Sequence, residues 1–224
     1  MRNNKPMNLL KKIYKNTFKI VFPSAGEIVD EFLIKEMRDC SRILDLGCGA
    51  LSPIGRIKSN LKPDLYSLGV DDFDPYLEIS KKNKIHSEYL KHNIFTIDFS
   101  EKSFDCAILL DVIEHFDRND FLEFLPKLEK IVKKIIIMTP NGFVKQEKYD
   151  NNEYQQHKSG WLVDDLVKLG FKCYGVSGLK FLRGELALPV IKPALIGNML
   201  ANISEPFVYN NPKRAYHLLC VINC

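Results

Sequence analysis

RILDLGCG, at residues 42–49, is the stretch that decides the fold of this chain. An apolar run passes through Asp45 and then turns at two glycines, Gly47 and Gly49, which predicts a buried strand, a tight loop and a following helix. Neither glycine has a Cβ, so the backbone can take positive φ there and lie close against a ligand. The helix would direct free N–H groups and its positive dipole end at that ligand. Asp45 comes at the carboxyl end of the strand, where open α/β sheets bind ligands.

Two kinds of nucleotide site compete for this loop. A dinucleotide site needs G-x-G-x-x-G, but Ser52 stands at the third glycine position and Gly55 comes three residues too late. The acid before the first glycine would also repel a pyrophosphate, and it suits a ligand with a cationic centre and no phosphate. With Cys48 between its two glycines, the loop resembles the first motif of the class I S-adenosylmethionine-dependent methyltransferases, an acid followed by G-x-G.

The spacing of a second acid supports a nucleoside ligand. Asp71 ends the next expected strand, 22 residues after Gly49, about where α/β nucleotide folds place the acid that binds a ribose diol. Asp72 follows it directly and is a further candidate. The resemblance also implies that Asn93, after the third expected strand, meets the adenine amino group, and that Ile94 packs on the adenine ring.

A second motif match lies at residues 103–116, which contain F-D-x-x-x-x-x-D-V-x-E-H. This segment resembles the part of the same superfamily that faces the methyl-bearing sulfonium. The resemblance implies that Asp111 orders the methionine end of the cofactor. Glu114 and His115 follow at the start of the next helix, and both are candidates for acid–base chemistry.

The polar stretch 143–160 has no clear period and is long for a loop inside a compact domain, so we interpret it as a lid on the acceptor side. It contains His157. A hydroxyl acceptor would need a base within hydrogen-bond reach, and the candidates are His157 and His115, with Glu114 behind them.

The resemblance implies an α/β fold with a Rossmann-like, doubly wound, seven-stranded sheet, mostly parallel with an antiparallel C-terminal strand. We expect a single methyltransferase domain over residues 1–224. Residues 1–38 would form an N-terminal helical cap, residues 40–176 the cofactor-binding core, and residues 177–224 the C-terminal strands with an apolar insertion. The helix expected at residues 119–132 contains Pro126, which predicts a break there.

Composition limits the possible partners and the compartment. The chain has 224 residues, of which 46% are hydrophobic, and a net charge of +4, so nothing demands a nucleic-acid partner. Its six cysteines are scattered, which is typical of reduced thiols and a cytoplasmic protein. His217, Cys220 and Cys224 resemble metal ligands only superficially, since no second pair accompanies them, and the sequence predicts no metal site.

Two segments leave a peripheral membrane contact open. Residues 7–22 place lysines opposite an apolar stripe, which suits either a helix packed on the domain or an interfacial helix on an anionic membrane. The apolar segment 186–200 is interrupted by Pro189, Lys192, Pro193 and Asn198, so it does not predict a membrane span. No signal-peptide pattern is evident.

The predicted function is therefore methyl transfer from S-adenosylmethionine, with S-adenosylhomocysteine as product, to a small-molecule or glycan- or lipid-linked acceptor at oxygen. The sequence Asn-Pro-Pro-Tyr, typical of many enzymes that methylate amino groups of nucleic acids, is absent after the fourth strand, and this disfavours a nucleic-acid substrate. Two alternatives are a nicotinamide or nucleotide-sugar enzyme of the Rossmann type and a non-catalytic module that binds the cofactor. The sequence does not determine the oligomeric state.

Overall fold

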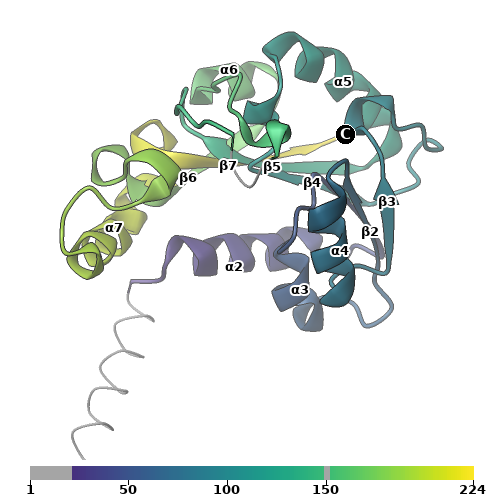
Figure 1. Ribbon diagram of the computed structural model, residues 1–224, viewed down its shortest axis with the longest axis horizontal. Helices are drawn as coiled ribbons and strands as arrows, with labels where there is room; N and C mark the ends of the chain where they lie inside the picture. The colour runs from purple at the N-terminus through teal and green to yellow at the C-terminus, as the bar shows by residue number, and fades with distance from the viewer. Residues whose placement is uncertain (1–21, 149–151) are drawn as a thin grey trace, which may run out of the picture.

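The computed structural model describes residues 22–148 and 152–224, and these contain a seven-stranded sheet (Figure 1). The strand order is β3-β2-β1-β4-β5-β7-β6, and β7 is antiparallel to both of its neighbours while β1 to β5 pair in parallel. The predicted doubly wound sheet with an antiparallel C-terminal strand is therefore confirmed. The strands are β1 (Arg42–Leu46), β2 (Tyr66–Asp71), β3 (Glu88–Lys91), β4 (Cys106–Leu110), β5 (Lys134–Pro140), β6 (Lys172–Leu179) and β7 (Ala215–Asn223).

Helices cover both faces of this sheet. In Figure 1, α2, α3 and α4 lie on one face, and α5 and α6 lie on the other. The core is split accordingly, because alternate strand residues point to opposite faces: Ile43 of β1 packs with Phe32 and Leu33, whereas Leu44 packs with Phe121 and Leu128. The helices are α2 (Ala25–Met37), α3 (Ile54–Ile57), α4 (Asp74–Lys82), α5 (Arg118–Ile131), α6 (Val163–Lys168) and α7 (Ala194–Tyr209).

The strand order places a binding crevice beside β1. This strand pairs with β2 on one side and β4 on the other, so the direction of winding reverses there. The carboxyl ends of parallel strands meet at the same edge, and the loops after β1 and β4 separate at this point to leave a crevice. The sequence motifs at Gly47, Asp71 and Asp111 all fall at this edge.

The break predicted at Pro126 is wrong. Helix α5 continues from Arg118 to Ile131 through this residue. Pro126 lies on the exposed side, where water can satisfy the carbonyl that loses its N–H partner, while Phe121 and Leu125 stay buried against the sheet. The packing of the apolar face therefore outweighs the local cost of proline.

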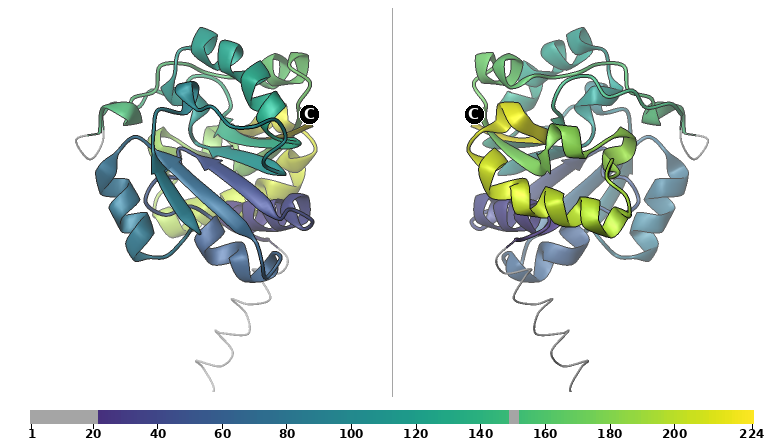
Figure 2. Two further views of the ribbon diagram at one scale, coloured as in Figure 1. Left: turned by 90° about the vertical axis from the view of Figure 1, so that its right-hand side faces the viewer. Right: turned by 90° about the vertical axis from the view of Figure 1, so that its left-hand side faces the viewer.

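The C-terminal part extends the fold at the β6 edge. Helix α7 packs on β6, and the right-hand view of Figure 2 shows it lying across that side of the molecule. Gly178 makes this close approach possible, because a Cβ there would lie 2.7 Å from the carbonyl oxygen of Ala201.

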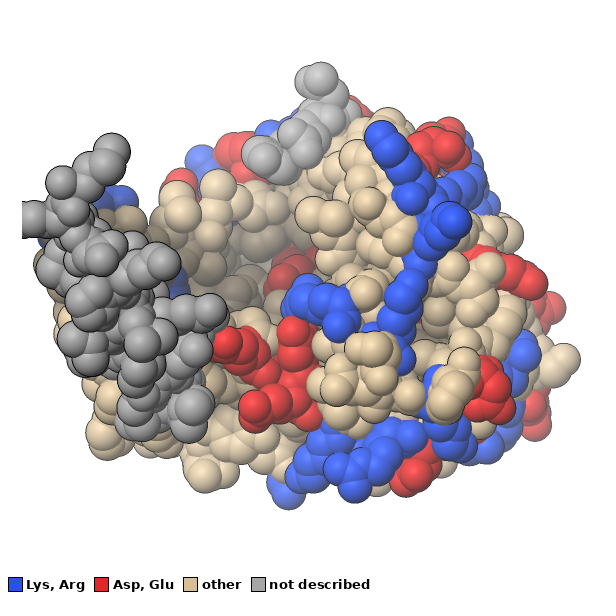
Figure 3. Space-filling view, turned by 90° about the horizontal axis from the view of Figure 1, so that it is seen from below, with Lys and Arg blue, Asp and Glu red and all other residues tan. Residues whose placement is uncertain are grey.

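The sequence analysis left open a basic helix at residues 7–22 and a contact with a membrane, and the described residues bear on these only in part. The predicted basic helix at residues 7–22 lies, except for Phe22, outside the described residues. Among the helices of residues 22–148 and 152–224, none combines the length and the apolar character that a membrane span requires. Seen from below, Lys and Arg are interspersed with Asp and Glu over the described residues of that face (Figure 3).

Candidate active site

The glycine loop after β1 has the backbone geometry expected from the sequence. Gly47 and Gly49 both have positive φ, +68° and +56°, which L-residues with a Cβ rarely adopt. The N–H groups of Gly47 and Cys48 both donate to the carbonyl oxygen of Val70, at 2.8 and 3.0 Å, and this fixes the loop to the end of β2.

The two glycines have different surroundings. A Cβ on Gly47 would lie 2.7 Å from Cγ2 of Val112, so this glycine allows the loop to pack against the residue after Asp111. A Cβ on Gly49 would meet nothing within 4 Å and would project into open space. Gly49 is therefore the position where a side chain would compete with a ligand rather than with the protein.

Asp45 lies beneath the loop and is almost fully buried, with 3% exposure. Its Oδ2 accepts a hydrogen bond from the Ser52 hydroxyl and lies 3.4 Å from Nε2 of His86. Burial raises the pKa of Asp45 to about 7, although the bond from Ser52 opposes this shift. Asp45 and Cys48 line a second pocket that opens on the other side of Gly47 and Gly49.

Most of the predicted cofactor residues line one pocket of about 610 Å³. It contains Gly47, Gly49, Asp71, Asp72, Asn93, Ile94 and Asp111. The structure thus brings seven of the nine predicted positions together, and the other two, Asp45 and Cys48, lie in the adjoining pocket.

The carboxylate of Asp71 is held by two backbone N–H groups. Its Oδ2 accepts from the N–H of Gly49 at 2.9 Å, and its Oδ1 accepts from the N–H of Phe73 at 2.9 Å. Each oxygen keeps a lone pair, so both can still accept from the hydroxyls of a ribose. Partial burial raises the pKa of Asp71, and the backbone N–H donors oppose that shift.

Asn93 and Ile94 follow β3 and line the same pocket. The side-chain oxygen of Asn93 accepts from the N–H of Phe95 at 3.0 Å, which starts the 3-10 helix η2 (Ile94–Thr96). Its amide is exposed and can still reach a ligand. Ile94 is buried and joins the core cluster, so it offers a fixed apolar wall.

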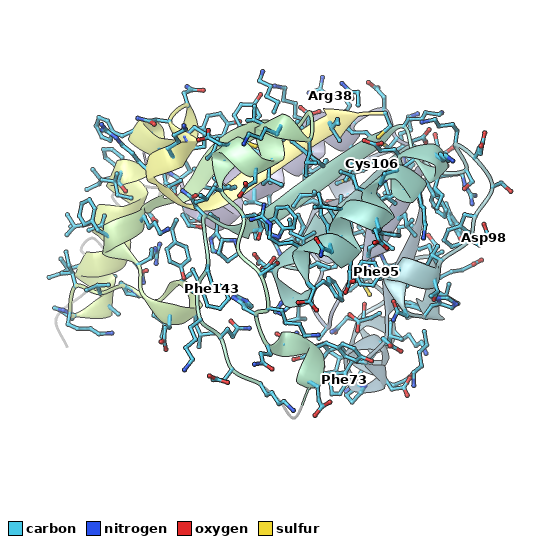
Figure 4. The ribbon with its side chains drawn as sticks, turned by 90° about the horizontal axis from the view of Figure 1, so that it is seen from above. Arg38, Phe73, Phe95, Asp98, Cys106 and Phe143 are labelled. Atoms are coloured by element: carbon cyan, nitrogen blue, oxygen red, sulfur yellow. The ribbon has the colours of Figure 1, made fainter. Side chains whose placement is uncertain are left out.

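The strap, which we define as residues 143–148 and 152–160, lines the pocket that contains most of the predicted cofactor residues. Figure 4 shows it descending from Phe143 to the 3-10 helix η4 (Glu153–Gln155), next to Phe73. The hydroxyl of Tyr154 donates to Oδ2 of Asp72 at 2.8 Å. Asn152, Tyr154 and Gln155 line the cofactor pocket. The predicted acceptor lid therefore also covers the cofactor side.

A third cavity opens on the other side of Asp111. Its lining includes Asp111, Glu114, His115, His157 and His217. Asp111 lines this cavity and the cofactor pocket, and it takes φ +55°, a costly conformation for a residue other than glycine. A group transferred from one ligand to another would pass this residue.

Glu114 is buried in the 3-10 helix η3 (Ile113–His115) and has 2% exposure. The Thr139 hydroxyl donates to its Oε2 at 2.9 Å, whereas Oε1 has no hydrogen-bond partner among the described residues. The N–H groups of Lys158 and Ser159 donate to its backbone carbonyl, at 2.8 and 3.0 Å, which anchors the strap beside it. Burial raises the pKa of Glu114 well above its usual range, and Asp111 raises it further.

The two candidate histidines lie against each other, with ring centroids 4.8 Å apart. Nδ1 of His115 is 3.3 Å from the carbonyl oxygen of Gln156, and Nδ1 of His157 is 2.6 Å from that of Val144. Burial lowers the pKa of His115 to about 4 and lowers the pKa of His157 as well. Both rings are therefore neutral near pH 7 and can act as acceptors.

Three residues that the sequence analysis did not select also belong to the site. Thr139 orients Glu114, Tyr154 attaches the strap to Asp72, and His217 lies with its Nε2 3.9 Å from Oδ1 of Asp111. The register that pairs Pro140 with His217 brings this histidine to the cavity. Cys220 is three residues later in the same strand and points to the opposite face, so the superficial grouping with His217 is not a site.

Comparisons with known proteins agree with this geometry. Residues 44–136 match a family model described as a methyltransferase domain. An uncharacterised protein of Methanocaldococcus jannaschii is 23% identical over 199 residues, which cover 82% of this chain and 81% of that protein. A SAM-dependent methyltransferase from Archaeoglobus fulgidus has a TM-score of 0.58 at 17% identity, over 94% of this chain and 100% of that one. The plantazolicin methyltransferase BpumL, solved in complex with SAH, has a TM-score of 0.54 at 16% identity, over 95% and 90%.

The matched segment includes the glycine loop, Asp71 and Asp72, and the motif around Asp111. This segment is similar to a methyltransferase domain, and the predictions of a methyltransferase and of S-adenosylmethionine as its cofactor are confirmed. The solved structures share the fold. Asp45, Asp71, Asp72 and Asp111 give the crevice an acidic lining that suits a sulfonium and would repel a pyrophosphate.

Proposed function

We propose that the protein methylates a hydroxyl oxygen of a small-molecule or glycan- or lipid-linked acceptor. One observation carries this proposal. The cavity that contains Glu114, His115 and His157 adjoins the cofactor pocket across Asp111. An acceptor in that cavity would lie beside the position of the methyl group and within reach of groups that can accept a proton.

The reaction is an in-line displacement at the methyl carbon. The acceptor oxygen forms a bond to carbon as the carbon–sulfur bond breaks, the sulfur keeps the electron pair, and the hydroxyl proton leaves. Because the sulfonium is already activated, the protein mainly has to align the acceptor and exclude water. Neutral His115 or His157 can accept the hydroxyl proton, and Asp111 faces the transferring group from the cofactor side.

An apolar surface beside the cavity supports a lipid-linked acceptor. Leu186 and Ala187 line the acceptor cavity. The chain then continues through Leu188 and Val190, both 58% exposed, to Leu195 of α7, which is 81% exposed. Gly197 packs this loop against α7, because its missing Cβ leaves room for Pro189 and the carbonyl oxygen of Ile191. An acyl or polyisoprenoid chain attached to the acceptor could lie along this surface.

The alternatives are weaker on physical grounds. A nicotinamide or nucleotide-sugar ligand would place a pyrophosphate against the carboxylates of the crevice. A nucleic-acid acceptor would favour a face of one charge, and in Figure 3 both signs are mixed over the described residues of the face shown. A non-catalytic module would bind the cofactor and transfer no methyl group to any acceptor.

The test is transfer of a labelled methyl group from S-adenosylmethionine to a panel of hydroxylated small molecules, free glycans and glycolipids. We expect a labelled methyl ether from at least one class and none from amines. Labelled amine products would contradict transfer to oxygen, and failure with every acceptor would favour the non-catalytic module. For the lipid-linked class, Leu195→Glu should reduce co-sedimentation with anionic liposomes, while Leu122→Glu on the exposed side of α5 should not. Equal sedimentation of both variants would remove the lipid surface from the proposal.

A further inference from the structure

Three side chains of the acceptor cavity are arranged as ligands for a metal ion. Glu114, His115 and His157 each offer a ligand atom, and these atoms all lie within 4.8 Å of one another. With metal bonds to nitrogen and oxygen of about 2.0–2.2 Å, neighbouring ligand atoms lie roughly 3.0–3.5 Å apart, and only two ligands on opposite sides of an ion reach roughly 4.2 Å. The cluster would therefore have to contract by up to roughly 1–2 Å to close around an ion.

The carboxylate of Glu114 lacks a partner that a cation would supply. Its Oε2 is held by Thr139, but Oε1 is buried and finds no hydrogen-bond partner within residues 22–148 and 152–224. Buried polar atoms are normally paired, and a buried carboxylate is expensive unless it is paired or binds a metal. The Glu114 carboxyl group together with the two histidine rings offers the donor set of a His₂-carboxylate centre.

The histidines are oriented as metal ligands usually are. A carbonyl oxygen can only accept, so the contacts from Nδ1 of His115 to Gln156 and from Nδ1 of His157 to Val144 place the ring proton on Nδ1. The lone pair is then on Nε2 in both rings. Metal-binding histidines almost always donate their other ring N–H to a carbonyl or carboxylate in this way, because the contact fixes the tautomer and the direction of the ring.

We propose that Glu114, His115 and His157 hold a divalent cation of the Mn²⁺, Fe²⁺, Co²⁺ or Zn²⁺ type, and that an open coordination position takes the acceptor oxygen. Imidazole and carboxylate together suit these ions, and three protein ligands leave at least one position free. The ion site stands on the three side chains alone, whereas its role in catalysis rests on the proposed function.

In this role the cation would take over the part assigned above to a histidine base. It would withdraw electrons from the acceptor hydroxyl and lower the pKa of that group, so that the proton leaves to solvent. The oxygen then bonds to the methyl carbon as the carbon–sulfur bond breaks, and the cation is neither oxidised nor reduced. No metal site was predicted at these residues, because Glu114 and His115 are contiguous whereas His157 comes from the strap.

The direct test is a titration of the full chain with Co²⁺, after removal of metals by chelation and without cofactor, followed by visible absorbance. We expect a band that saturates near one equivalent and is displaced by Zn²⁺. Glu114→Gln and His157→Ala should each weaken Co²⁺ binding at least about 10-fold. His92→Ala, which changes a histidine on the cofactor side, should leave Co²⁺ binding unchanged. Absence of a saturating band, or equal affinity in all variants, would overturn the proposal.

Two further measurements separate failure of this site from failure of the proposed function. Thermal unfolding of each variant in the presence of a chelator shows that it is folded. Methyl transfer to a hydroxyl that is unaffected by complete removal of metal would refute the catalytic role of the cation while leaving the proposed function intact. Tight Co²⁺ binding lost in both ligand variants would support the ion site even if no hydroxyl acceptor were methylated.

Discussion

Alanine at the two loop glycines should have different effects: Gly47→Ala should mainly reduce stability, and Gly49→Ala should mainly reduce cofactor binding. Gly47→Ala places a Cβ 2.7 Å from Val112, where ordinary carbon contacts are about 3.5–4.0 Å, and it also forces φ +68° on an L-residue. The left-handed conformation costs roughly 1–2 kcal/mol and overpacking roughly 1–3 kcal/mol. We therefore expect a loss of about 2–5 kcal/mol in the free energy of unfolding. Gly49→Ala should lose only the cost of the left-handed conformation, about 1–2 kcal/mol in the free energy of unfolding, because its Cβ meets none of the described atoms within 4 Å.

The loss of cofactor binding should be greater in Gly49→Ala than in Gly47→Ala, which is the reverse of their order in stability. The Cβ of Gly49→Ala projects into the space that both adjoining pockets share, so S-adenosylhomocysteine should bind much more weakly to this variant. The assay is thermal unfolding with and without S-adenosylhomocysteine. A loss of 1 kcal/mol lowers Tm by about 2–4 °C in a chain of this size, so the Tm of Gly47→Ala should fall by roughly 4–20 °C. The double variant Gly47→Ala/Val112→Ala should recover the part due to overpacking. Equal destabilisation by the two single variants, or normal ligand binding by Gly49→Ala, would refute the reasoning.

Three other outcomes follow from the same contacts. Asp71→Ala should weaken S-adenosylhomocysteine by about 1–3 kcal/mol in calorimetry, the value of a hydrogen bond to a charged group, and unchanged affinity would exclude ribose binding. Tyr154→Phe removes the hydrogen bond to Asp72. In stopped-flow experiments the variant should release the cofactor several-fold faster, with little change in Tm. An unchanged release rate would mean that the strap does not retain the cofactor. Burial, with Arg183 and His157 nearby, lowers the pKa of His217 to about 4, so the folded state binds fewer protons than the unfolded chain below pH 6.5. The stability that neutral His217 contributes is present above pH 6.5 and is lost as the pH falls towards 4. Between pH 7.5 and 5, the free energy of unfolding of the wild type should therefore fall by about 2 kcal/mol relative to that of His217→Gln in urea titrations. Parallel dependence on pH in the two proteins would contradict this.

Local patterns were sufficient to predict the cofactor side of the site. The acid and two glycines after β1 and the acid after β2 depend on short stretches of chain, and parallel strands bring their carboxyl ends to one edge. Asp71 and Gly49 therefore meet across a single hydrogen bond, as their separation in the sequence suggested. The direction in which each missing Cβ would point could not be inferred, because Val112 reaches Gly47 only through the pairing of β1 with β4.

The acceptor side depends on contacts between distant segments, and the sequence predicted less of it. His115 and His157 were selected as separate candidates for a base, and nothing in their spacing showed that their rings would touch. His217 reaches the cavity through the register of β5 with β7, which no local pattern encodes. At Pro126 the local pattern predicted too much. Proline predicts a break in the helix, but the packing of the buried face of α5 keeps the helix continuous.

Thermal unfolding in parallel with S-adenosylhomocysteine, S-adenosylmethionine and NAD tests most directly the claim that this crevice holds a sulfonium cofactor. A ligand at 100 times its Kd stabilises by about 2.7 kcal/mol, which corresponds to a rise in Tm of roughly 5–10 °C for a chain of this length. We expect such a rise with the first two ligands, none with NAD, and its loss in Asp71→Ala. A rise with NAD alone, or an undiminished rise in Asp71→Ala, would contradict it.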